Sequence, residues 1–196
     1  GAHVKYRDIY TEGITKITAE DMKYAKELGM TIKLLADSKR DGERFSAMVC
    51  PVMLGKDSPL YSVNGVFNAV FVHGNVLGDA MFYGSGAGKL PTASAVAGDM
   101  VDCAKHLGKT VMMNWSNREL EQVDRKEVTH PFFVRIQGNR EERLPEVLET
   151  FANSKVVTVP ELTGEFGFVT ECISEAEFEE KAAKLEGVLG RIRIRA

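Results

Sequence analysis

Residues 84–107 read Gly-Ser-Gly-Ala-Gly-Lys-Leu-Pro-Thr-Ala-Ser-Ala-Val-Ala-Gly-Asp-Met-Val-Asp-Cys-Ala-Lys-His-Leu, and this stretch decides the fold of the first half of the chain. After Pro91, apolar side chains recur at helical spacing, which predicts a long helix that Gly108 ends. The apolar positions are Ala93, Val96, Ala97, Met100, Val101, Ala104 and Leu107. Residues 84–88, the glycine loop, therefore join a strand to a helix.

The glycine loop has the composition of a ligand-binding turn. Its backbone carries few side chains, and the helix that follows supplies amide groups and the positive end of a dipole, which suits a phosphate or another electron-rich group. The usual motifs are incomplete, because a dinucleotide fingerprint needs Gly where Lys89 stands and a P-loop needs Ser or Thr where Leu90 stands. From the residues alone, a tight structural turn is favoured over a binding loop, and both stay open.

The residues before the glycine loop predict a mostly antiparallel sheet with a helix against it. Thr18 begins a capping box for the helix, and Pro51, near the end of the second strand, and Pro59 are expected to break the stretch that follows it. The first two strands are expected to pair as a hairpin with a longer loop. The expected elements are a helix over 19–28 and strands over 31–36, 45–52, 66–73 and 76–83.

The residues after the helix predict a polar connector over 109–128, anchored by Trp115, and then the order βαββαβ. The strands are expected over 130–137, 156–162, 165–173 and 188–194, with helices around 144–151 and after Ser174. The predicted fold class is α+β: a mostly antiparallel sheet with helices on one face, followed by a ferredoxin-like domain. The predicted domains are 3–108 and 129–196, joined by the connector.

The composition excludes several classes of protein. The chain has 196 residues and a formal net charge of -3, which argues against a nucleic-acid-binding protein with a basic face. It has no run of eighteen apolar residues and no leader peptide, so no membrane association is expected and the expected location is the cytoplasm. Because residue 1 is Gly and not Met, the chain is expected to have been processed or cut from a longer polypeptide.

The isolated polar and reactive residues mostly have simple interpretations. No metal site is expected, because the four histidines lack metal-ligand spacing, and they are interpreted as surface or turn residues. The three cysteines are interpreted as reduced and buried, and Asp99 and Asp102 as part of a solvated helix face. The histidines are His3, His73, His106 and His130, and the cysteines are Cys50, Cys103 and Cys172.

Two further patterns have alternatives. Arg191, Arg193 and Arg195 alternate with isoleucines, which favours a half-exposed strand over a phosphate-binding ladder. Asn68 stands in an apolar strand, where it would satisfy a buried backbone group or mark an interface.

Several blocks resemble homoserine dehydrogenases, in family order and at family spacing. The blocks are Tyr10-Thr11-Glu12-Gly13-Ile14-Thr15 with Ile17 and Asp21, then Leu28-Gly29-Met30 with Ile32-Lys33-Leu34-Leu35-Ala36, then Asn68-Ala69-Val70, and then Gly86-Ala87-Gly88 with Pro91-Thr92-Ala93-Ser94-Ala95-Val96. The resemblance implies an oxidoreductase of threonine, methionine and isoleucine biosynthesis, which reduces aspartate 4-semialdehyde to L-homoserine with NADP or NAD as cofactor. It makes Gly86, Ala87 and Gly88 the candidates for cofactor contact.

The resemblance also implies parts that residues 1–196 do not match. The family's cofactor fingerprint, its substrate-binding Glu and its catalytic Asp-x-x-x-Lys have no counterpart, and Cys103 stands where Lys would follow Asp99. The chain is therefore expected to be a C-terminal fragment with no catalytic residue of its own, inactive alone because it has no general acid, and without tightly bound cofactor.

The βαββαβ tail resembles an ACT domain. That resemblance implies an amino-acid effector at the loop over 137–143, with Gly138, Asn139 and Arg140 as candidate contacts, and assembly as a homodimer or higher homo-oligomer. The family's Asp-x-x-Gly is replaced by Arg143-Leu144-Pro145-Glu146, so a purely structural or dimerising tail stays open. The rival functions are an amino-acid-sensing module without a catalytic role and a nucleotide binder that uses the glycine loop.

Overall fold

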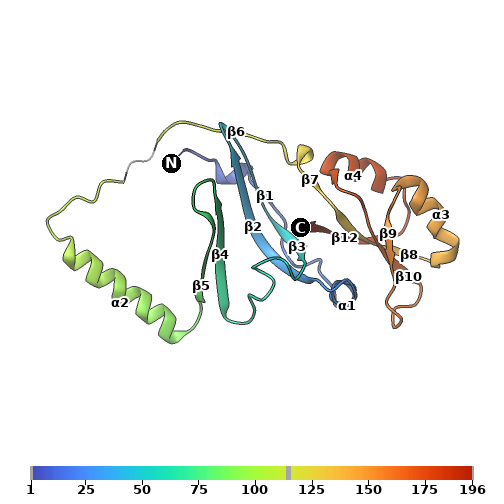
Figure 1. Cartoon of the computed structure of the whole chain (residues 1–196), viewed down its shortest axis with the longest axis horizontal. Coiled ribbons are helices and arrows are strands. Elements are labelled where there is room, and N and C mark those ends of the chain that lie inside the picture. Colours follow the sequence, from blue (N-terminus) through green and yellow to red (C-terminus); the bar gives the residue numbers. More distant parts are fainter. Residues whose placement is uncertain (1, 114–115, 196) are drawn as a thin grey trace. The chain divides into compact units, whose positions relative to one another are not determined.

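The computed structural model describes residues 2–113 and 116–195, and it divides into two compact units (Figure 1). The hairpin unit comprises residues 58–116, and the sheet unit comprises residues 2–57 together with 117–196. The division predicted from the sequence, at 3–108, 109–128 and 129–196, follows the family arrangement and stays a prediction. The expected anchor Trp115 lies outside the described residues.

The sheet unit contains most of the regular structure. Its strands are β1 (Tyr10–Thr11), β2 (Thr31–Asp41), β3 (Arg44–Leu54), β6 (Glu121–Gln122), β7 (Thr129–His130), β8 (Phe132–Gln137), β9 (Lys155–Val157), β10 (Glu165–Val169), β11 (Ile173–Ser174) and β12 (Val188–Arg195). Its helices are η1 (Tyr6–Asp8), α1 (Ala19–Glu27), η2 (Arg125–Glu127), α3 (Arg140–Thr150) and α4 (Glu175–Ala182). Eight of these strands form one sheet, and β7 pairs with β11 separately.

Strand β3 organises the sheet because its two edges have different partners. Along one edge it pairs antiparallel with the whole of β2, from Thr31 opposite Leu54 to Asp41 opposite Arg44. The predicted hairpin is thus confirmed, but the longer loop is wrong, since Gly42 adopts a φ of +58° and allows a two-residue turn.

The other edge of β3 is shared by three short parallel strands. In order along β3 these are β6, β1 and β12, which pair with residues 44–45, 48–49 and 52–54. Pro51, expected near the end of a strand over 45–52, does not end β3, which continues to Leu54; it lies at the point where β1 gives way to β12. A proline is tolerated there because the ladder on that edge changes partner.

The tail has the predicted βαββαβ order, and its strands lie in the antiparallel order β12-β8-β10-β9. Helices α3 and α4 lie side by side on one face of these strands (Figure 1). The core between helices and strands is apolar and rich in phenylalanine: Phe132, Val134, Ile136, Val147, Phe151, Phe166, Phe168, Phe178 and Leu185. Because β12 also pairs with β3, the sheet of the tail continues into the N-terminal half of the sheet unit.

Helix α1 packs on the opposite face of the sheet. The predicted capping box is present, with Thr18 Oγ1 accepting from the Asp21 amide and Asp21 Oδ2 accepting from the Thr18 amide at 2.8 Å. The buried Arg135 of β8 donates to Thr18 Oγ1 and Asp21 Oδ1, and its other donors bind the Glu165 carboxylate. This arginine therefore ties the start of α1 to the neighbouring strands β8 and β10.

A second buried arginine lies on the α4 face of the sheet. Arg193 is only 1% exposed, so the expectation that the arginines of the last strand are half-exposed is wrong for this residue. Its guanidinium forms two hydrogen bonds with the Glu175 carboxylate and donates to Glu12 Oε2 at 2.9 Å. Arg125 in turn donates to Glu175 at 2.6 Å and to Glu179 at 2.8 Å.

We call Glu12, Arg125, Glu175, Glu179 and Arg193 the Arg193 cluster. It joins β12 and the start of α4 to the segment before α1 and to η2. Burial alone would raise the pKa of Glu12, but the hydrogen bond from Arg193, the charge of Arg191 and the hydroxyl of Tyr10 together hold the pKa of Glu12 below its ordinary value. The Arg193 cluster thus pairs arginines with glutamates, and its buried charged groups each have a partner of opposite charge.

The hairpin unit consists of β4 (Phe67–Gly74), β5 (Gly78–Ser85) and α2 (Lys89–Lys105). The two strands predicted over 66–73 and 76–83 are present and pair as a hairpin, and the predicted long helix is confirmed, although α2 begins two residues before Pro91. Helix α2 has no buried residue, and Met100 on its apolar stripe is 68% exposed. The stripe that the sequence predicts is therefore present and uncovered. Across the described residues, no helix is long and apolar enough to cross a lipid bilayer.

The substitution Glu175→Gln is expected to lower the free energy of unfolding by about 3 kcal/mol, because the buried Arg193 then keeps only Glu12 as a charged partner. Urea unfolding followed by circular dichroism measures the change. The matched control is Glu180→Gln on the same helix, whose carboxylate forms an exposed pair with Lys184 at 3.1 Å and is expected to matter little. Equal losses in the two variants would contradict the role of the cluster.

The depressed pKa of Glu12 predicts a contribution to stability that is present above the ordinary value of 4.5 and is lost as the pH falls through the lower, folded-state pKa. Denaturant unfolding measured from pH 6 downward is expected to show a weaker loss below pH 4.5 in Glu12→Gln than in the unaltered chain. Glu149→Gln, at an exposed position of α3, is the control and is expected to retain the full pH dependence. An identical pH profile for all three proteins would refute the prediction.

Candidate functional site

The glycine loop lies between β5 and α2, and at Gly88 the backbone conformation itself favours glycine. Gly88 is the N-cap of α2 and has a φ of +118° and a ψ of 159°, a conformation that residues with a Cβ rarely adopt. A Cβ at Gly86 would lie 2.5 Å from Nδ2 of Asn68, so a larger residue there would displace the end of that exposed side chain. The structural-turn interpretation of the loop is therefore supported at Gly88, and it does not exclude ligand binding.

The start of α2 presents backbone donors. Gly88 offers no side-chain cap, and the first helical bond runs from the Thr92 amide to the Gly88 carbonyl at 3.1 Å. The amides of Gly88, Lys89 and Leu90 consequently have no partner within the helix. The first turn of α2 contains no acidic residue, so these donors and the helix dipole favour an electron-rich acceptor.

Asn68 supports the loop from the neighbouring strand. It lies opposite Gly84 in the β4–β5 ladder, and its Nδ2 donates to the Val66 carbonyl at 3.4 Å. The side chain is exposed, so the expectation that it satisfies a buried backbone group is wrong. Its closeness to Gly86 gives Asn68 a different role, which is to limit the space beside the loop.

The candidate effector residues lie together in the loop between β8 and α3. Gly138 has a φ of +123°, and the Oδ1 of Asn139 caps α3 by accepting from the Glu141 amide at 2.9 Å. Arg140 is the first residue of α3 and is exposed. Gly138 and Asn139 thus each have a local structural role, whatever ligand the loop takes.

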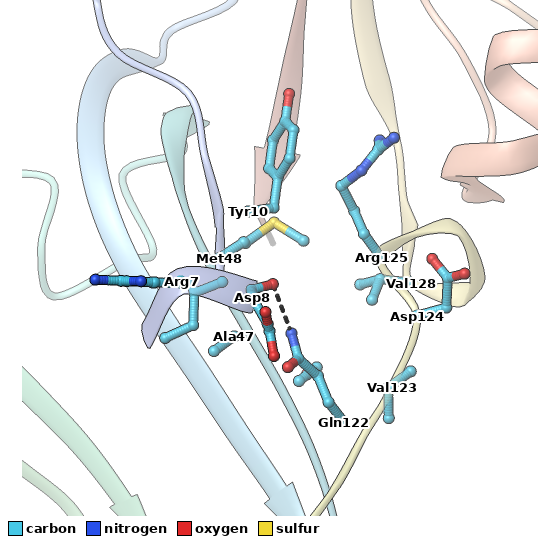
Figure 2. A pocket seen from close by; sticks show the side chains of 12 residues that line it. Arg7, Asp8, Tyr10, Ala47, Met48, Gln122, Val123, Asp124, Arg125 and Val128 are labelled. Atoms are coloured by element: carbon cyan, nitrogen blue, oxygen red, sulfur yellow. Dashed lines mark hydrogen bonds between the residues drawn. The ribbon is translucent and has the colours of Figure 1, made fainter. Parts of the chain in front are cut away.

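An open groove of about 480 Å³ in the sheet unit was not predicted from the sequence (Figure 2). Its walls come from three distant segments, 7–10, 46–48 and 122–128, which explains why no local motif signals it. In Figure 2 the side-chain amide Nε2 of Gln122 donates across the groove to the backbone carbonyl of Asp8, at 3.0 Å. None of the residues predicted as cofactor or effector contacts lines the groove. The Arg125 guanidinium at its wall is already bound to Glu175 and Glu179.

The cysteines and histidines give no metal site. Among the described residues, no group of three or more His, Cys, Asp or Glu side chains is placed to hold a metal ion. Only Cys50 is buried, which raises the pKa of its thiol, whereas Cys103 and Cys172 are exposed, contrary to the expectation of buried cysteines.

His130 also differs from the expected surface position, because it is half-buried, and this burial lowers its pKa. The expectation of surface or turn positions is correct for the exposed His73 and His106. Asp99 and Asp102 lie on the solvated surface of α2, as expected.

Comparison with known proteins decides the family. The family model described as homoserine dehydrogenase matches residues 1–101, which is slightly more than half of the chain and includes the glycine loop. The chain belongs to the homoserine dehydrogenase family. The matched region contains all the blocks on which the sequence resemblance rests.

Individual homoserine dehydrogenases are similar over about half of the chain. The enzyme of Bacillus subtilis (strain 168) is 42% identical over 105 residues, which are 54% of this chain and 24% of the relative. The enzyme of Mycobacterium leprae (strain TN) is 51% identical over 104 residues, which are 50% of this chain and 24% of the relative. The aligned region therefore spans about a quarter of the length of these curated relatives.

Solved structures extend the similarity over nearly the whole chain. A homoserine dehydrogenase from Thiobacillus denitrificans has a TM-score of 0.79 and 28% identity, covering 97% of this chain and 48% of that chain. The S. aureus homoserine dehydrogenase at pH 6.0 has a TM-score of 0.71 and 25% identity, covering 98% of this chain and 49% of that chain. The α+β fold of the tail is therefore similar to that of family members, although the family model ends before it.

The substitution Gly88→Ala is expected to destabilise the start of α2 by about 1–3 kcal/mol, because alanine cannot adopt the φ of +118° without strain. Hydrogen exchange of the Thr92 amide, which bonds to the Gly88 carbonyl, reports the loss. Gly98→Ala in the middle of the same helix has open space around it and is expected to stabilise α2 by about 0.8–1 kcal/mol. The prediction fails if the two substitutions shift exchange in the same direction.

Proposed function

We propose that this chain contributes the cofactor-contacting loop and the tail of a homoserine dehydrogenase, which reduces aspartate 4-semialdehyde to L-homoserine with NADPH or NADH. The observation that carries the proposal is the match of the homoserine dehydrogenase family model to residues 1–101, which contain the glycine loop and the start of α2, together with 42–51% identity to individual homoserine dehydrogenases. The spacing of the glycines and of Pro91-Thr92 after them agrees with this assignment. The proposed location is the cytoplasm.

The residues of the glycine loop fit a nicotinamide cofactor. Gly88 presents its backbone without a side chain, and the amides at the start of α2 have no partner in the helix. Gly86, Ala87 and Gly88 would hold the cofactor through their backbone. Gly88 is the first candidate because it is the N-cap of α2 and its amide has no partner in the helix. When bound, the cofactor supplies the hydride for the reduction. The part played by this chain is to bind the cofactor and to orient it.

The general acid of the reaction has no candidate in residues 1–196. Reduction of an aldehyde needs a proton donor for the developing alkoxide, and the family's Asp-x-x-x-Lys has no match here. On helix α2, Cys103 stands four residues after Asp99, and the Asp99 side chain is exposed to solvent. We therefore expect residues 1–196 alone to have no dehydrogenase activity.

Assembly as a homodimer or higher homo-oligomer is proposed together with this function. Its support is the amount of exposed apolar surface in the hairpin unit, where Phe82 is 69% exposed and Val70 and Met100 are similarly uncovered. A regulatory and dimerising module without a catalytic role is the second candidate. It is favoured by the βαββαβ tail, whose strand order is that of a ferredoxin-like domain.

A chimera tests the proposal. The part of the Bacillus subtilis enzyme that precedes its matched region is fused ahead of residue 3 of this chain, and oxidation of NADPH by aspartate 4-semialdehyde is followed by absorbance. We expect turnover by the folded chimera and none by residues 1–196 alone. A folded chimera without turnover would contradict the dehydrogenase proposal, and turnover by residues 1–196 alone would contradict the need for a further general acid.

The same chimera tests the glycine loop. Gly88→Ala is expected to raise the KM for NADPH several-fold, because the substitution distorts the backbone that would contact the cofactor. Gly55→Ala, where the added methyl meets open space and φ is ordinary, is expected to leave the KM unchanged. Equal KM values for the two variants would remove the glycine loop from the cofactor site.

A further inference from the structure

Three loops meet at one end of the tail, beside the start of α3. The Gln137 amide donates to the Gly187 carbonyl at 2.9 Å, and the Gly138 amide donates to the Gly164 carbonyl at 2.8 Å. The β8–α3 loop is thereby fixed to the turn before β10 and to the turn before β12. Together with α3, these loops form a notch.

The side chain of Arg143 fills this notch. Its Nη1 donates to the Gln137 carbonyl at 2.8 Å, and its Nη2 donates to the Glu186 carbonyl at 3.0 Å. Its Nε and Nη2 both bind Oε2 of Glu146, at 3.0 and 2.9 Å. The acceptors therefore come from β8, from the turn before β12 and from α3 itself.

The glycines on either side leave the room that this side chain needs. A Cβ at Gly138 would lie 2.8 Å from Cδ of Arg143, and a Cβ at Gly187 would lie 3.3 Å from its Nη1. Both glycines also have a positive φ, at +123° and +70°. The backbone around the notch is thus shaped to the stem and the planar head of an arginine.

The chemistry of the acceptors is specific for a guanidinium. Two backbone carbonyls and one carboxylate surround a planar group that donates from three nitrogens, an arrangement that a single ammonium cannot satisfy with the same geometry. We propose that this notch is a guanidinium-binding site that the chain fills with its own Arg143, so that another guanidinium binds there only when that side chain has left.

The proposal does not depend on dehydrogenase activity, and it restricts what the notch can bind. The hydrogen bonds of Arg143 end at Gln137, Glu146 and Glu186. A second guanidinium can therefore reach these acceptors only after the Arg143 side chain has left.

Chemical rescue tests the site. Arg143→Met keeps most of the apolar stem and removes the guanidinium, and it is expected to lower the Tm of the chain by several degrees. Ethylguanidinium chloride at low millimolar concentration is expected to restore at least half of this loss, whereas tetramethylammonium chloride at the same ionic strength restores none. The unaltered chain is expected to respond to neither salt, because its notch is full.

Arg140→Met is the matched control, because Arg140 is exposed at the first position of the same helix. Recovery of Arg143→Met alone supports the site. No recovery, or the same gain in both variants, overturns it, the latter because the cation then binds adventitiously. If Arg143→Met does not fold, ethylguanidinium present during refolding is expected to yield the folded chain, and failure to do so likewise overturns the proposal. The activity of the chimera is not used, so this result is separate from that of the proposed function.

Discussion

The pairing of Arg193 with Glu175 is the constraint on which the sheet unit depends. Both side chains are almost completely excluded from solvent, and an isolated charge in that position would be strongly unfavourable. Glu175 is held at the first turn of α4, Arg193 comes from β12, and Glu12 and Arg125 complete the charges from two other segments. Strand β12 can therefore take its place beside β3 only when α4, η2 and the segment before α1 are also in place.

This arrangement makes the tail and the N-terminal half of the sheet unit parts of one sheet. Ile192 and Ile194 of β12 pack with Tyr24 of α1 on one face, and Arg193 joins the cluster beneath α4 on the other. Arg135 forms a similar set of buried ion pairs on the α1 face, where it links Asp21 to Glu165. Both central arginines are thus specific connectors between elements, since a buried charge tolerates fewer alternative partners than apolar contact does.

Glycines make room for an arginine side chain beside the β8–α3 loop of the tail. Gly138 and Gly187 provide the space into which Arg143 fits, just as Gly86 provides the space beside Asn68 in the hairpin unit. In both places a Cβ on the glycine would force a neighbouring side chain to move. The difference between the two loops matters for function, because the glycine loop leaves helix amides open, whereas the tail loop is filled by a side chain of the same chain.

The sequence by itself determined the local elements and the family. The capping box at Thr18, the strands around Gly42 and Gly74, the helix after the glycine loop and the βαββαβ order all follow from short-range signals, and the quoted blocks identify the homoserine dehydrogenase region. Only the tertiary structure decided that β3 changes its partner from β1 to β12 beside Pro51, that Arg193 is buried and that Arg143 fills the notch beside the β8–α3 loop. The physical reason is that each of these depends on partners far away in the chain: β12 beside β3, Glu12 beside Arg193, and Glu186 beside Arg143. Alternation along β12 indicates which residues share a face, but only the packed structure shows that both faces are covered.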